Sequence, residues 1–144
     1  MGESRPNIIL ITTDQQRYDS VRLNGSPFMN TPNQDRLGTE GVAFRRAYCP
    51  STVCTPSRVS MMTGLQLSRH GAYNIGTTAG DYSLFLSSIL RREGYLTHHV
   101  GKAHWHPYWA PSPENRPVDE NGSPYRDFAG FETAEVCIEI ERAS

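Results

Sequence analysis

The chain has 144 residues, about the length of one domain, and 37% of them are hydrophobic. Its 14 basic and 15 acidic residues leave a net charge of −1, so no basic field predicts nucleic acid or an anionic membrane as a partner. No apolar run approaches the ~18 residues of a membrane span, and no signal-peptide pattern precedes the first apolar run, so we expect a cytoplasmic protein.

The first predicted element is a buried parallel strand over residues 7–13, a short apolar run rich in β-branched side chains. It ends in Asp14 and Gln15. Ligands of open α/β sheets gather at the carboxyl ends of strands, so these two side chains are candidate ligand contacts. In the alternative interpretation, Asp14 caps a turn.

The next predicted elements are a short helix and a second strand. Thr31 is a candidate N-cap, Pro32 suits the first helical position, and Gly41 is a candidate stop. Residues 42–48 alternate loosely between apolar and polar, which favours a strand that leads towards Cys54.

The densest stretch is residues 54–64, Cys-Thr-Pro-Ser-Arg-Val-Ser-Met-Met-Thr-Gly. Pro56 favours the first turn of a helix that Gly64 ends. Cys54 would then lie at or just before the helix N-terminus, where the dipole and free N–H groups favour negative charge, and Arg58 would lie one turn further on. A nucleophile beside an arginine at a helix start suits an oxyanion substrate. The alternative is a buried structural cysteine.

Further along the chain, residues 83–92 predict an amphipathic helix capped by Gly94. Residues 96–100 predict a strand that leads towards Lys102 and His104. If the extended geometry continues, Lys102 and His104 point to one side and form an oxyanion clamp with a proton donor. The alternative is a solvated pair at a strand end.

The last third of the chain changes in character. Residues 107–127 interleave proline with polar residues and predict an irregular segment. Residues 133–140 alternate partly, which favours an edge strand. No internal repeat and no domain boundary is apparent.

Residues 54–64 resemble the signature of the type I sulfatase family, C-x-P-S-R-x-x-x-x-T-G, at every fixed position. Residues 95–104 are similar to the family motif Y-x-T-x-x-x-G-K-x-H, and residues 31–37 to T-P-N-x-D-x-L. The resemblance covers about residues 6–132 and identifies residues 1–144 as the N-terminal portion of a single catalytic domain. It implies an α/β, alkaline-phosphatase-like fold whose mostly parallel sheet, flanked by helices, is incomplete in this chain.

The resemblance also implies the activity, hydrolysis of small-molecule sulfate esters. In the family, a maturing enzyme oxidises the cysteine, here Cys54, to formylglycine, whose hydrate is the nucleophile. Arg58 would stabilise the deprotonated nucleophile and the transferring group. Lys102 would bridge formylglycine and substrate, and His104 would bond to the hydrate. An asparagine near Asn74 contacts the substrate oxyanion in some branches, whereas the residues alone favour a turn asparagine equally well.

A divalent cation is the cofactor that the resemblance implies, namely calcium, with manganese or magnesium as alternatives. Asp14, Gln15 and the modified Cys54 would begin its site, although Gln15 stands where most sulfatases have a second acid. The Asp-Gln variant resembles the choline-sulfatase-like and phosphonate monoester hydrolase branches. Calcium takes about 6–8 oxygen ligands, so the family's C-terminal half would have to provide the rest. We therefore expect the isolated chain to be weak or inactive.

Several alternatives remain at this stage. The chain could belong to a phosphonate monoester or phosphodiester hydrolase of the same superfamily, or be a truncated, non-catalytic fragment. A thiol redox protein would use Cys49 to resolve Cys54. The three cysteines are an odd number, which argues against a disulfide framework, and their spacing fits no usual zinc pattern.

Overall fold

The computed structural model describes residues 5–107, 114, 122–123 and 126–136. The chain folds as two compact units, Met1–Ala47 and Tyr48–Ser144, and each is described by itself. None of the helices in these described ranges has the length and the apolar run that a membrane-spanning helix needs.

The first unit contains two short 3-10 helices, η1 (Tyr18–Ser20) and η2 (Arg22–Asn24), and the helix α1 (Pro32–Glu40). The prediction for α1 is confirmed at both ends, because proline occupies its first position and the N–H of Gly41 closes it on Leu37 O at 3.0 Å. The Thr31 hydroxyl does not accept from a backbone amide of the first turn, so it does not cap the helix. It accepts from Arg22 N at 2.9 Å and donates to Asp35 Oδ1 at 3.1 Å, which fastens η2 to α1.

The prediction of two strands in the N-terminal third of the chain is wrong. Residues 7–13 and 42–48, all of which are described, form no strand. Their apolar side chains are exposed, with Ile9 at 82% and Phe44 at 79%. A strand is stable only when its backbone pairs with another strand and its apolar faces are covered. A local sequence pattern shows that a segment can pair, but it does not show that a neighbouring strand is present.

The second unit contains four helical elements: α2 (Cys54–Thr63), α3 (Leu67–His70), η3 (Tyr82–Leu84) and α4 (Leu86–Arg92). The helix predicted at the signature is confirmed as α2, which follows extended Val53 and ends at left-handed Gly64 with φ of 70°. The single helix predicted over residues 83–92 is instead η3 and α4. They are separated by Phe85, which is extended and fully buried.

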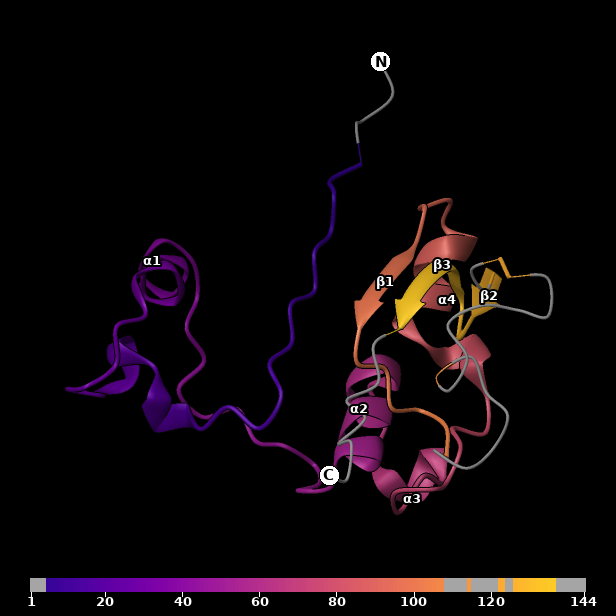
Figure 1. Cartoon of the computed structure of the whole chain (residues 1–144), viewed down its shortest axis with the longest axis horizontal. Helices are drawn as coiled ribbons and strands as arrows, with labels where there is room; N and C mark the ends of the chain where they lie inside the picture. The colour runs from indigo at the N-terminus through magenta and orange to yellow at the C-terminus, as the bar shows by residue number, and fades with distance from the viewer. Residues whose placement is uncertain (1–4, 108–113, 115–121, 124–125, 137–144) are drawn as a thin grey trace. The chain divides into compact units, whose positions relative to one another are not determined.

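Three strands form the sheet among the described residues: β1 (His98–Gly101), β2 (Arg126–Phe128) and β3 (Phe131–Val136), in the order β1-β3-β2 (Figure 1). β1 and β3 run parallel, whereas β2 and β3 run antiparallel, so the sheet is mixed rather than mostly parallel. β3 is central here, because strands pair on both its sides. The strand predicted over residues 133–140 as an edge strand is therefore a central strand, and it begins at Phe131. Residues 137–140 lie outside the described residues.

The prediction for residues 107–127 also falls mainly outside the described residues, although its last two residues already belong to β2. β2 and β3 are joined by two residues with positive φ, Ala129 at 49° and Gly130 at 82°. Positive φ at both central positions is the mark of a type I′ hairpin turn, whose twist matches that of paired strands. Ser87 Oγ donates to Ala129 O at 2.6 Å, which holds the turn against α4.

The core of the second unit lies between α2, α4 and the sheet. Trp105 is 2% exposed, and its ring lies 5.3 Å from Phe85 and 5.9 Å from Phe131, measured between ring centroids. These aromatic contacts join the residue before α4, β3 and the segment after β1. That segment carries Lys102 and His104, so the core packs directly against a predicted part of the site.

Candidate active site

Cys54 is the first residue of α2, and its thiol is free and half-buried. Its neighbours Thr55 and Pro56 are fully buried and hold this end of the helix in place. The first hydrogen bond of the helix runs from Ser57 N to Val53 O at 3.2 Å. The side chain at position 54 therefore lies at the positive end of the helix, where free amide groups favour a negative charge.

Arg58 connects this helix to a segment 44 residues away. Its side chain is buried, with the residue 9% exposed, and Nη1 donates to Lys102 O at 2.9 Å. A buried guanidinium needs such acceptors because its charge is otherwise costly to remove from water. The structure thus brings the helix that carries Cys54 and Arg58 to the segment that carries Lys102 and His104.

The geometry of that segment differs from the predicted alternation. Gly101 ends β1 with φ of 102°, and His104 has φ of 57°, so the chain after β1 is not a continued strand. Ala103 is 1% exposed and His104 2% exposed, whereas Lys102 is half-buried. The simple rule that residues two apart point to one side does not apply here, because it holds only for extended backbone.

Asn74 lies in a tight, exposed turn. Its Oδ1 accepts from Ile75 N at 2.8 Å, and its backbone O accepts from Thr77 Oγ1 at 2.6 Å. This is the turn role that asparagine often fills. Contact between Asn74 and a substrate stays a prediction.

Cys49 has a structural contact that sequence reasoning missed. Its Sγ lies 2.8 Å from Ser57 Oγ, and it donates to Ser51 O at 2.6 Å. Cys49 and Cys54 are both free thiols. Cys49 thus helps to hold the serine of the signature stretch in the first turn of α2.

Asp14 and Gln15 belong to the first unit, and both are exposed. Gln15 has a left-handed φ of 51°. A carboxylate and an amide oxygen are the kind of donors that a hard cation accepts, but two donors are too few for calcium. The described part of the chain contains no group of three or more His, Cys, Asp or Glu that could hold a metal ion.

Ser60 and His70 form a pair that resembles a nucleophile and its base. Ser60 Oγ lies 2.8 Å from His70 Nε2, and Ala72 N donates to His70 Nδ1 at 3.1 Å. Since Nδ1 accepts, the proton of the neutral ring is on Nε2, which donates to the serine. Burial lowers the pKa of His70, so the ring stays neutral at neutral pH. The pair therefore fastens α2 to α3 and does not activate Ser60.

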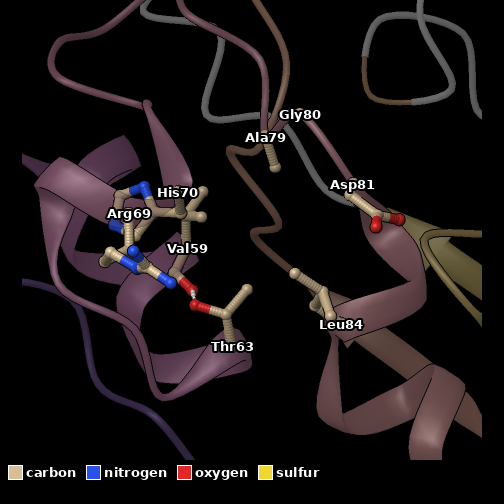
Figure 2. A pocket seen from close by; sticks show the side chains of 8 residues that line it. All are labelled: Val59, Thr63, Arg69, His70, Ala79, Gly80, Asp81 and Leu84. Carbon is tan, nitrogen blue, oxygen red and sulfur yellow. Dashed lines mark hydrogen bonds between the residues drawn. The ribbon is translucent and has the colours of Figure 1, made fainter.

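A pocket of about 130 Å³ lies at the C-terminal end of α2 (Figure 2). One wall comes from α2 and α3, and the other from residues 79–84. The lining residues are Val59, Thr63, Arg69, His70, Ala79, Gly80, Asp81 and Leu84. Thr63 is nine residues beyond Cys54, which is roughly 13 Å along a helix. The pocket contains none of the predicted catalytic residues, so it is not the candidate active site.

Glu114, His106 and Tyr82 form a hydrogen-bonded group beside His104. Sequence reasoning missed this group, because His106 is separated from Glu114 by 8 positions and from Tyr82 by 24, and no motif spacing relates the three residues.

The fold and the site together define an α/β protein with a free cysteine at a helix N-terminus and a buried arginine that joins this helix to a Lys-Ala-His segment. The sulfatase family model matches residues 6–136, and the chain belongs to the sulfatase family. The predicted family is thereby confirmed.

Two relatives illustrate the similarity. The arylsulfatase of Clostridium perfringens is 39% identical over 105 residues, which cover 72% of this chain and 22% of that protein. Human arylsulfatase A is 36% identical over 107 residues, which cover 70% of this chain and 21% of that protein.

Among solved structures, the chain is similar to the phosphonate monoester hydrolase of Agrobacterium radiobacter, with a TM-score of 0.72 and 28% sequence identity. The match covers 96% of this chain and 27% of that one. It confirms the predicted alkaline-phosphatase-like α/β fold. The chain thus spans about a fifth to a quarter of the length of these three proteins.

Proposed function

We propose that the chain is the nucleophile-bearing part of a sulfuric ester hydrolase. The observation that carries the proposal is the hydrogen bond from Arg58 Nη1 to Lys102 O, which joins the helix of the signature to the Lys-His segment. Membership of the sulfatase family supports the same conclusion. Cys54 is the proposed site of formylglycine formation, which a maturing enzyme carries out.

In the proposed mechanism, the hydrated aldehyde at position 54 provides the nucleophilic oxygen and later releases sulfate without attack by water at sulfur. The start of α2 stabilises negative charge on that oxygen. Arg58 adds a fixed positive charge one turn along the helix, and Lys102 neutralises the oxygens of the transferring group. His104 holds the proton that the leaving alcohol requires.

Asp14 and Gln15 are the proposed first ligands of a divalent cation. A cation bound there would withdraw charge from the sulfate group. The described residues provide too few donors for a complete site, so further ligands would come from other residues of the full-length protein.

A phosphonate monoester hydrolase is the second candidate. Gln15 brings no charge, in contrast to a second carboxylate, and the likeness to the phosphonate monoester hydrolase structure extends over 96% of this chain. Aryl sulfate and aryl phosphonate substrates, compared by kcat/KM with the full-length protein, separate the two activities.

The test of the nucleophile uses the full-length protein, produced together with a maturing enzyme. Cys54→Ala should lower kcat by about a thousandfold or more, because a nucleophile that forms a covalent intermediate has no substitute. Peptide mass should show an aldehyde in place of the thiol at position 54.

Cys49→Ser is the control, since it removes the other described thiol and keeps a hydroxyl beside Ser57. It should leave kcat within about threefold of the wild-type value. An unmodified thiol at position 54 in an active protein would contradict the proposed chemistry, and wild-type kcat in Cys54→Ala would exclude Cys54 as the nucleophile.

A further inference from the structure

Glu114 is a buried carboxylate that bonds to the backbone directly after His104. It is 4% exposed. Its Oε1 accepts from Trp105 N at 2.6 Å and from His106 N at 2.9 Å. A buried carboxylate is costly unless hydrogen bonds replace its hydration, and here two backbone amides provide them.

The segment of residues 102–106 is therefore held at both ends by buried charges. At its start, Arg58 donates to the carbonyl of Lys102 at 2.9 Å. At its end, Glu114 accepts from two consecutive amides. Between the two anchors, His104 has φ of 57°, a left-handed conformation that non-glycine residues keep only when their surroundings impose it.

Two side-chain hydrogen bonds connect Glu114 to Tyr82 in η3 through His106. His106 Nδ1 lies 3.3 Å from Glu114 Oε1, and a carboxylate only accepts, so Nδ1–H donates to it. His106 Nε2 then accepts from the Tyr82 hydroxyl at 2.8 Å. Burial, followed by the negative charge of Glu114, raises the pKa of Tyr82, so the hydroxyl keeps its proton as a donor.

We propose that Glu114 is a positioning residue for His104, which it holds in its left-handed conformation through the amides of Trp105 and His106. Glu114 acts only through the backbone and does not touch the substrate. The inference rests on the proposed function in one respect, namely that His104 takes part in the reaction. A general acid is effective only within hydrogen-bond reach of the leaving-group oxygen that it protonates. Small displacements of the His104 imidazole therefore lower the rate.

The experiment compares Glu114→Ala and Glu114→Gln in the full-length protein. Glu93→Ala is the matched control, because Glu93 is an exposed glutamate at the end of α4. Two readouts are used: amide hydrogen exchange at Trp105 and His106, and kcat with KM per folded, formylglycine-containing molecule. Normalisation to folded molecules separates positioning from a simple loss of stability.

We expect amide exchange at Trp105 and His106 to accelerate by about tenfold or more in Glu114→Ala. We expect kcat to fall by about 10- to 100-fold, with KM within about threefold of the wild-type value. Glu114→Gln keeps an acceptor oxygen without the charge and should lose only about threefold to tenfold in kcat. The control should match the wild type in both readouts.

Wild-type exchange and wild-type kcat in the Glu114 variants would overturn the proposal. If Glu114→Ala does not fold, Glu114→Gln decides by the same two readouts. If the wild-type protein hydrolyses neither sulfate nor phosphonate esters, the proposed function fails, and the exchange measurement still decides whether Glu114 holds the segment.

Discussion

At the scale of single residues, burial keeps the imidazole of His99 neutral. The His99 ring lies 5.2 Å from the rings of both Trp105 and Phe131, and its Nε2 lies 3.2 Å from Gly101 O. Burial lowers the pKa of His99, although the bond to Gly101 and the charge of Glu114 oppose this shift. The imidazole therefore packs as a neutral ring beside the segment that carries Lys102.

We predict that acid destabilises the protein partly through His99. The unfolded chain takes up a proton near pH 6.5, whereas the folded protein takes it up only at lower pH. The free energy of unfolding should therefore fall as pH decreases below about 6.5, and level off below the folded pKa. His99→Phe keeps a packed ring without the titrating group, so it should lose less stability between about pH 7.5 and pH 5.5.

Urea unfolding at the two pH values measures this difference. Some pH dependence should persist in the variant, because burial also lowers the pKa of His70. Equal losses of stability in His99→Phe and the wild type would show that His99 does not contribute.

At the scale of elements, the close approach of the hairpin turn to α4 holds the sheet against the helix layer. Gly130 has φ of 82°, and a Cβ built on it would collide with Ser88 Oγ and come within 2.6 Å of Ser88 N. The opposing atoms include helix backbone, which cannot move aside. Ser87 Oγ and Thr97 Oγ1 bond to the turn carbonyls of Ala129 and Gly130 at 2.6 and 3.1 Å.

We predict that Gly130→Ala destabilises the protein by about 2–4 kcal/mol, because a left-handed conformation and an overpacked contact both add to the cost. Gly71→Ala is the matched control. Gly71 has φ of 73° and open space around its Cβ position, so only the conformational cost of about 1 kcal/mol applies. Urea unfolding measures both variants, and equal losses would mean that contact with α4 contributes nothing.

At the scale of the whole molecule, the first unit has an exposed apolar run that directly precedes the two proposed metal ligands. Residues 8–11 expose their apolar side chains by 53–82% and pair with no strand among the described residues. The proposed metal ligands Asp14 and Gln15 follow directly in the sequence. The chain spans about a fifth of the length of two of its relatives.

We predict that calcium stabilises the full-length protein and that this effect requires Asp14. A ligand that binds only the folded state adds about 2.7 kcal/mol at a hundredfold excess over its Kd. Asp14→Ala should abolish the stabilisation, which is measured by thermal unfolding with calcium and with a chelator.

Asp19→Ala is the control for Asp14, since Asp19 is an exposed carboxylate of the same unit that pairs with Arg17 at 2.6 Å. It should keep the full calcium effect. Equal stabilisation of Asp14→Ala and the wild type would exclude Asp14 as a ligand.

By itself, the sequence was sufficient for the family, the candidate nucleophile and the bounds of α1 and α2. These depend on local features: proline in the first turn, glycine at the end, and a signature within eleven consecutive residues. The same local reasoning also identified Arg58, Lys102 and His104 as candidates.

Only the tertiary structure decided which predicted strands form, how the strands are ordered and what holds His104. A strand exists only with a partner, so residues 7–13 and 42–48 were predicted incorrectly from a pattern that could not include one. The bond between Arg58 and Lys102 spans 44 residues, and Glu114 accepts from the amides of Trp105 and His106, which precede it by 9 and 8 residues. Such contacts depend on packing between distant segments, which no local spacing encodes.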